Sequence, residues 1–335
     1  MAGKKGSGRK RKASTDSTAP IAFDRRSMER TQANLHAVLA QHDFDSIEEA
    51  NAFLARYMGP DAEDLPDAVP ETPLQQAQQV MYDAFDAHGK KRATLARKAL
   101  EISPDCADAY VVLAEETAGS AEEARDLYAA GVLAGERALG PEPFEEGKGG
   151  FWGILETRPY MRAREGLALA LRDLGEEDAA LAHVLGMLEL NPNDNQGVRC
   201  HAALWLVKAG RCDEAKALLR RYKGDEMLDM YWARAVLAFR TRGPGKIARR
   251  RFREAAERNP SMLAFLCGAE KPLKEYPTAV AYGSLEEGFV GAVALIPLLD
   301  DDEIGEWFYD EFRLLMADFA ASEGLESAPE DVDAG

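Results

Sequence analysis

Residues that could perform covalent or metal chemistry are few in this sequence, and they lie far apart. The histidines and cysteines show no spacing typical of a metal site, a disulfide framework or a catalytic motif; they are His36, His42, His88, His183, His201, Cys106, Cys200, Cys212 and Cys267. Cys200 and His201 are adjacent, but neighbouring residues of a helix point to different sides. No phosphate-binding glycine loop, G-x-S-x-G or H-E-x-x-H sequence occurs. We therefore expect no catalytic residue, no metal and no cofactor.

Arginines beside aromatic residues are better suited to binding another molecule, because a guanidinium can form two parallel hydrogen bonds to a carboxylate. They gather at the end of a glycine-rich segment, residues 141–160, which reads PEPFEEGKGGFWGILETRPY. Long irregular segments of this kind are often functional. One interpretation is that the aromatic side chains fill a gap between helices. The other is that Trp152, Arg158, Tyr160 and Arg162 form one wall of a ligand site.

The elements that would position these residues are short helices, which follow from apolar residues at i, i+3, i+4 and i+7. The stretch before Pro192 has this pattern at Leu167, Ala168, Leu171, Ala180, Val184 and Met187, with Gly175 in the middle. The stretch before Pro260, sixty-eight residues later, repeats it at Trp232, Ala235, Val236, Phe239, Ala248, Phe252 and Ala255, with Gly243 in the middle. Each predicts two helices joined at a glycine and ended by proline, which cannot continue a helix. Three further pairs are predicted over residues 72–104, 105–139 and 193–226.

Capping signals and composition divide the rest of the chain. Ser or Thr followed three residues later by Glu or Gln predicts helix starts at Ser46, Thr72, Ser120 and Ser284. The expected organisation is a disordered basic tail (1–20), a helical pair (21–58, with helices over 21–41 and 46–57), a linker (59–72), an array of helix pairs (73–262, with the insertion at 141–160), capping helices (263–321, with helices over 284–295 and 301–321) and a disordered acidic tail (322–335).

The array resembles tetratricopeptide repeats at the positions given before Pro192 and Pro260. The stretches FWGILETRPYMRAR and LELNPNDNQGVR also resemble a bacterial group of these proteins related to the suppressor of tumorigenicity 7 family. The resemblance implies an all-α, right-handed superhelix of antiparallel helix pairs that binds proteins. It also implies that the first helix of each pair lines a concave groove, with inward positions Arg162, Glu165, Leu169, Arg172, Gly197, Cys200, Leu204, Val207, Met230, Ala233, Leu237 and Arg240. Gly166 and Cys200 depart from the asparagine and lysine that some members use to bind a C-terminal carboxylate, so chaperone-tail binding is not expected.

The charge distribution limits the partners. The net charge is −17, yet the first thirteen residues hold six Lys or Arg and no acid. A body this acidic is repelled by nucleic acids and anionic membranes. The longest apolar run, VGAVALIPLL at 290–299, is too short to span a bilayer, so we expect a cytoplasmic protein.

The function that fits best is a non-enzymatic adaptor that binds a peptide or protein segment in the groove. Its expected contact residues are Trp152, Arg158, Tyr160, Arg162, Glu165, Leu169, Arg172, Leu204, Met230, Leu237 and Arg240. Of these, Arg162, Arg172 and Arg240 are expected to anchor acidic groups of the partner. The alternative is a nucleic-acid-associated factor that uses the basic tail and the basic strip from Arg240 to Arg258, which more often is a solvated helix face. A third possibility is an enzyme active at the insertion. The sequence does not identify the partner.

Overall fold

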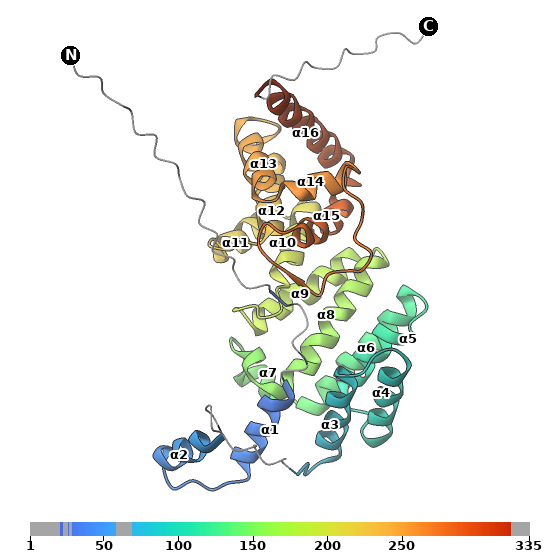
Figure 1. Ribbon diagram of the computed structural model, residues 1–335, viewed down its shortest axis with the longest axis vertical. Helices are drawn as coiled ribbons and strands as arrows, with labels where there is room; N and C mark the ends of the chain where they lie inside the picture. The colour runs from blue at the N-terminus through green and yellow to red at the C-terminus, as the bar shows by residue number, and fades with distance from the viewer. Residues whose placement is uncertain (1–20, 23–25, 27–28, 58–68, 323–335) are drawn as a thin grey trace, which may run out of the picture.

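The computed structural model describes residues 21–22, 26, 29–57 and 69–322, and the secondary structure of this part of the chain is helical apart from two short strands (Figure 1). The helices are α1 (Glu29–Ala40), α2 (Ile47–Tyr57), α3 (Pro73–Phe85), α4 (Lys90–Ile102), α5 (Ala107–Thr117), α6 (Ala121–Leu139), α7 (Glu142–Glu146), α8 (Arg158–Asp173), α9 (Glu177–Leu190), α10 (Arg199–Lys208), α11 (Cys212–Arg221), α12 (Leu228–Arg242), α13 (Lys246–Arg258), α14 (Pro260–Leu266), α15 (Leu285–Leu299) and α16 (Asp302–Ser322). The predicted all-α class is confirmed. The predicted tails and most of the linker lie outside the described residues.

Five consecutive helix pairs form the body of the molecule: α3/α4, α5/α6, α8/α9, α10/α11 and α12/α13. Their bounds follow the predicted local signals. Thr72 forms a complete capping box with Gln75 at the start of α3, and Gly175 and Gly210 turn the chain between paired helices with φ of 78° and 68°. Pro260 both ends α13 and opens α14, where Asn259 accepts a hydrogen bond from the Ser261 amide. The periodicity therefore predicted the helices of these five pairs, whereas α14 was not predicted.

Packing joins the pairs into an elongated body (Figure 1). Within and between the pairs, each helix contacts the next, and some first helices also contact one another, as α5 does α8 and α10 does α12. One buried cluster runs from Val111 to Phe308, and a smaller, alanine-rich cluster lies between α3, α4 and α5. The core is thus stretched along the molecule. We call the side formed by α3, α5, α8, α10 and α12 the first-helix face.

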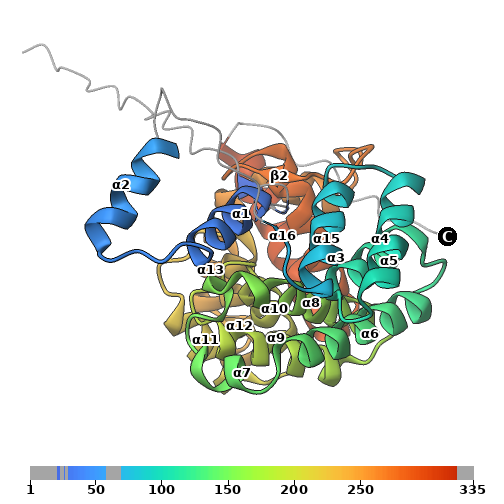
Figure 2. The same cartoon turned by 90° about the horizontal axis from the view of Figure 1, so that it is seen from below.

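Flanking segments cover this first-helix face. Helix α15 packs against α10 and α12, and α1 packs against α3. Figure 2 shows α1, β2 and α15 on one side of the body and α7, α9 and α11 on the other. Helix α16 contacts α13 and α15 and lies at one end (Figure 1). The C-terminal helices therefore do more than cap the last pair.

The prediction of a helix over residues 21–41 was wrong at its start. Strand β1 (Ile21–Ala22) pairs antiparallel with β2 (Ala279–Val280), and the helix begins at Glu29. A short ladder satisfies backbone groups in both segments, and the pairing depends on residues more than 250 positions apart. Local periodicity could not indicate it.

Candidate functional site

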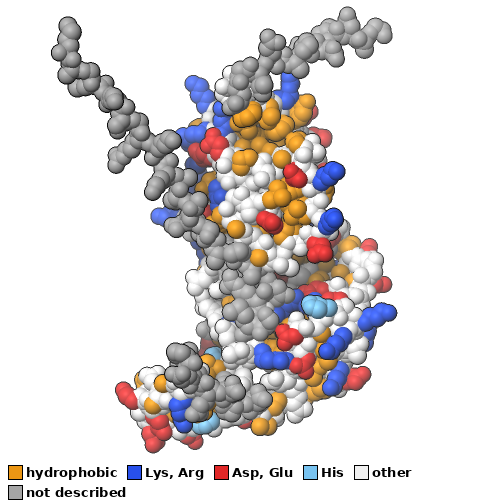
Figure 3. Space-filling model, in the orientation of Figure 1, with side chains coloured by type: hydrophobic (Ala, Val, Ile, Leu, Met, Phe, Trp, Pro, Cys, Tyr) orange, Lys and Arg blue, Asp and Glu red, His pale blue; other side chains and the backbone are white. Residues whose placement is uncertain are grey.

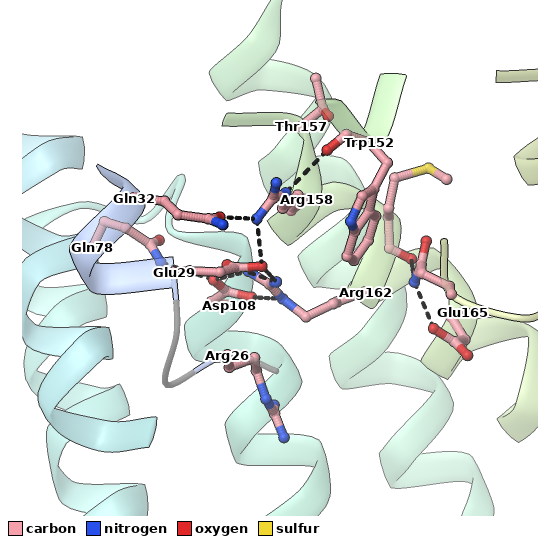
Figure 4. A network of polar contacts seen from close by, with 12 residues as sticks. Arg26, Glu29, Gln32, Gln78, Asp108, Trp152, Thr157, Arg158, Arg162 and Glu165 are labelled. Atoms are coloured by element: carbon pink, nitrogen blue, oxygen red, sulfur yellow. Dashed lines mark hydrogen bonds and ion pairs between the residues drawn. The ribbon is translucent and has the colours of Figure 1, made fainter. Parts of the chain in front are cut away.

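Two arginines of α8 converge on one carboxylate from the N-terminal helix (Figure 4). The Nη1 atom of Arg162 donates to both carboxylate oxygens of Glu29 at 2.9 Å. The Nη1 atom of Arg158 donates to Oε1 of Glu29 at 3.2 Å and to Oε1 of Gln32 at 2.9 Å. Charge-assisted, multidentate contacts of this kind are among the stronger hydrogen bonds in proteins. We call Arg158 and Arg162 the arginine clamp.

A second carboxylate, that of Asp108, binds Arg162 of the clamp. Asp108 of α5 has no exposed surface, and its two oxygens accept hydrogen bonds from Nε and Nη2 of Arg162, each at 2.7 Å. The Gln78 amide donates to the same carboxylate at 2.9 Å. Burial lowers the pKa of Arg162, but Asp108 and Glu29 outweigh it, so the pKa lies above its usual value. Arg162 is therefore a fixed positive charge joining α5, α8 and α1.

The insertion positions the clamp from its other side. The hydroxyl of Thr157 donates to the carbonyl oxygens of Phe151 and Ile154, which fixes the two short 3-10 turns η2 (Phe151–Gly153) and η3 (Leu155–Thr157). The carbonyl oxygen of Trp152 then accepts a hydrogen bond from Nε of Arg158 at 3.0 Å, and the guanidinium lies 5.4 Å from the Trp152 ring centroid. This part of the insertion therefore orients Arg158.

Tyr160 lies apart from the clamp, although the sequence grouped it with Trp152, Arg158 and Arg162. Residues i and i+4 of a helix share a face, as Arg158 and Arg162 do, whereas i+2 points elsewhere. Tyr160 is buried and packs against Phe144 and Phe151 with ring centroids 5.0 and 6.0 Å away. Its hydroxyl accepts a hydrogen bond from Arg164. The packing of Tyr160 therefore agrees with the interpretation that aromatic side chains of the insertion fill a gap between helices.

Acidic subsites flank the clamp and contact two more arginines of the N-terminal segment. Arg26 donates to both oxygens of Glu115 on α5, at 3.0 and 3.1 Å, and lies 5.2 Å from the ring centroid of Phe85. Arg30 forms ion pairs with Asp83 at the end of α3 and with Asp86, which follows α3. The surface beneath the segment therefore alternates in sign: negative, positive, negative.

The remaining predicted contact residues on α10 and α12 are mostly enclosed. Leu204 and Met230 are buried in the same cluster as Leu295 and Leu298 of α15, and Leu237 packs against that cluster. The prediction that Leu204 and Met230 point into an open groove was wrong for the folded chain, because α15 covers this part of the first-helix face. On α8, Leu169 stays 39% exposed.

Predicted anchors elsewhere on the face have intramolecular partners. Arg172 donates to Oε1 of Glu177 at 2.6 Å and lies 5.7 Å from the Trp205 ring centroid. Arg240 pairs with Asp301 and Glu303 at the turn between α15 and α16. The three predicted anchors therefore have different partners. Arg162 binds Glu29 of the N-terminal helix, Arg172 binds Glu177 five residues later, and Arg240 binds the start of the C-terminal helix α16.

Other cations of the basic strip from Arg240 to Arg258 also form ion pairs. Arg249 contacts Glu311, Arg253 contacts Asp318, Arg250 and Arg251 contact Glu254, and Arg258 lies 3.9 Å from both Glu226 and Glu287. Pairing with acidic neighbours is what the solvated-face interpretation predicts. Because these arginines are paired, the strip has less uncompensated positive charge with which to bind a phosphate of a nucleic acid.

Glu165, one turn beyond Arg162 on α8, gives a pH-dependent prediction. Burial raises its pKa to about 7 from an ordinary value of 4.5, and the Gln196 amide donates a hydrogen bond to it. The folded protein therefore holds this proton more tightly than the unfolded chain, so its contribution to stability is full below about pH 4.5 and is lost as pH rises through 7. Glu165→Gln is expected to raise the free energy of unfolding by about 1 to 2 kcal/mol at pH 8 and to leave it unchanged near pH 4.5.

Urea denaturation of both proteins between pH 4.5 and 8 measures this difference. Glu177→Gln is the control with the opposite sign, because hydrogen bonds from Lys208 and Arg172 lower the pKa of Glu177. It is expected to destabilise the protein slightly at pH 8. A Glu165→Gln difference that did not change with pH would contradict the assignment.

Glu29, Asp108, Glu115 and Asp83 were not among the predicted site residues. The contacts of Glu29 with Arg158 and Arg162 span 129 and 133 positions of the chain. A predicted arginine anchor on α8 indicates that a carboxylate is needed, but no spacing in the sequence indicates which one.

No group of three or more His, Cys, Asp or Glu side chains arranged to hold a metal ion occurs within residues 29–57 and 69–322. The four cysteines are free thiols. In the same part of the chain, no helix has the length and apolar character needed to cross a membrane.

Comparison with known proteins gave no match. No protein-family profile, curated protein sequence or solved structure is significantly similar to this chain.

Proposed function

We propose that this protein is a tetratricopeptide-type helical scaffold, a right-handed superhelix of helix pairs, that acts as a non-enzymatic adaptor. Its groove is the part of the first-helix face formed by α3, α5 and α8, beside the part that α15 covers, and the arginine clamp in that groove binds an acidic side chain of a partner protein. Successive helix pairs shield one another's apolar faces, which is why the body is extended and offers a long surface. Repeats of this kind present such surfaces to extended peptides or helices.

The observation that carries the proposal is the capture of Glu29. Two guanidinium groups, one turn apart on α8, are aligned on a carboxylate that reaches them from a segment far away in the chain. Asp108 and the Trp152 carbonyl hold both arginines in place independently of Glu29. A preorganised clamp loses little side-chain entropy on binding, which is how a small surface gains affinity for a carboxylate.

Arg158 is the residue to change, because Arg162 also neutralises the buried Asp108. Affinity capture of the intact chain from its own cells, followed by mass spectrometry, is expected to recover a set of proteins that Arg158→Glu loses. Reversing the charge places a carboxylate at position 158, which repels the partner's acid in this subsite.

Arg211→Glu is the matched control, because Arg211 is the N-cap residue of α11 and pairs with Glu214 in the first turn of that helix, away from the clamp. It is expected to recover the wild-type set. If Arg158→Glu recovered the same proteins as wild type, while both variants showed the helical circular dichroism of wild type, the clamp would not be the binding site.

A further inference from the structure

The N-terminal segment places three charged residues in three complementary subsites. Arg26 contacts Glu115, Glu29 contacts the arginine clamp, and Arg30 contacts Asp83 and Asp86. The subsites belong to α5, α8 and the end of α3. Together they bind the charges of one stretch of chain in the order positive, negative, positive. Arg26 is also seated over the Phe85 ring, at 5.2 Å, which adds a cation–π contact.

We propose that Arg26 and helix α1 are a built-in ligand of the groove, and that the partner's segment carries the same charge order: an arginine, a glutamate three residues later and a basic residue directly after it. This inference rests on the proposed function and specifies its ligand. The partner and the N-terminal segment compete for the same three subsites. An arginine-x-x-glutamate-arginine sequence at the start of a helix is the expected recognition element.

The segment is attached in a way that allows release. Of the α1 side chains, Glu29 and Val38 are buried, whereas the others keep part or all of their surface exposed. Its contacts with the subsites are mainly ion pairs. Those of Arg30 are solvated and therefore weak, so the largely buried pairs of Glu29 with the arginine clamp are the main contacts that release must break. The β1–β2 ladder is two residues long. Little apolar surface therefore opposes its departure.

The charged side chains of the groove keep other hydrogen-bond partners when the segment leaves. Arg162 keeps its bidentate contact with Asp108, and Arg158 keeps the Trp152 carbonyl. Glu115 keeps Arg92, whose Nη2 atom donates to it at 2.8 Å. No buried charge is left without a partner, so the cost is that of exposing the ion pairs alone. A tethered ligand has a high effective concentration, which sets a threshold for the competing partner.

The test uses the full chain and a fluorescein-labelled peptide with the sequence of residues 20–41. In Arg26→Gln/Glu29→Gln protein the tethered ligand is weakened, and we expect fluorescence anisotropy to show at least tenfold tighter binding of the peptide than in wild type. A peptide with the three charges reversed at positions 26, 29 and 30 is expected not to bind. Glu48→Gln, at an exposed position on α2, is the control protein and is expected to behave as wild type.

Equal binding of the peptide by wild type and the double variant would overturn the inference, as would equal binding of the charge-reversed peptide. The two proposals fail separately. If Arg158→Glu loses cellular partners but the double variant gains no affinity for the peptide, the adaptor function stands and the built-in ligand is wrong. If the peptide exchanges as expected but Arg158→Glu loses no partner, the segment is a ligand of its own groove and the adaptor function is wrong.

Discussion

Asp108→Asn should lower the free energy of unfolding by about 3 kcal/mol, because removing one member of a buried ion pair leaves the other charge without compensation. Asp108 is fully buried and bonds both Nε and Nη2 of Arg162 at 2.7 Å. Asparagine keeps the shape of the side chain, but its NH2 group would face an N–H of the Arg162 guanidinium, so that two hydrogen-bond donors oppose each other. Glu29 still neutralises part of the charge, which places the effect at the lower end of the range for such pairs. Urea denaturation of the full chain measures the change.

Two further variants separate this effect from ordinary surface electrostatics. Asp83→Asn removes an ion pair with Arg30, but the Asp83 side chain is 62% exposed, so we expect a loss of about 0.5 kcal/mol or less. The double variant Asp108→Asn/Arg162→Gln removes both buried charges and should recover part of the loss of Asp108→Asn, since no uncompensated ion remains. Equal destabilisation by Asp83→Asn and Asp108→Asn would show that burial does not strengthen the pair.

The helices could be predicted because their signals are local. Thr72 caps α3 through atoms three residues away, and the positive φ of Gly175 lies between the last residue of one helix and the first of the next. Each signal acts within one turn of its helix and needs no distant partner. The same reasoning failed at residue 21, where a strand partner at residues 279–280 replaces helix formation.

The site could be predicted only in part, because the positions of its arginines depend on local helical spacing whereas the position of their carboxylate partner depends on tertiary contacts. Arg158 and Arg162 share a face of α8, which helical spacing determines. Their ligand, Glu29, is placed by the return of the N-terminal segment along α3 and α5, and no residue near Glu29 in the sequence indicates that path. Thus the sequence predicted that arginines of α8 bind a carboxylate, but it did not predict that this carboxylate is Glu29.

The cover over α10 and α12 was missed for a related reason. A Cβ atom at Gly288 would lie 2.9 Å from the Met262 amide nitrogen, and one at Gly291 would lie 2.6 Å from Cδ2 of Leu228. Gly291 therefore allows the close approach of α15 to α12, and Gly288 allows its close approach to α14. In the sequence they stand within an apolar stretch without a clear single stripe, so they indicated neither the face nor its partner.

Phe252→Ala is expected to have the largest effect on the C-terminal half, a loss of about 3 to 5 kcal/mol in the free energy of unfolding, because it empties a large cavity in a packed core. The Phe252 side chain on α13 is fully buried, with ring centroids 5.1 Å from Trp232 on α12 and 5.0 Å from Phe308 on α16. It therefore holds three helices together. Hydrogen exchange should show faster exchange in α16 and α12, whereas amides of α3 and α4, which have a separate core cluster, should keep their protection.

Phe319→Ala provides the control on α16, because Phe319 is 55% exposed and its truncation should change stability by about 0.5 kcal/mol or less. Phe252→Leu fills most of the cavity and should lose less than Phe252→Ala. The pattern of exchange matters as much as the size of the loss. If α3 and α4 lost protection together with α16, the chain would unfold as one cooperative unit, and the separation of the two core clusters would have no energetic meaning. Local loss confined to α12, α13 and α16 would instead show that this end of the body can open while the α3 and α4 cluster stays packed.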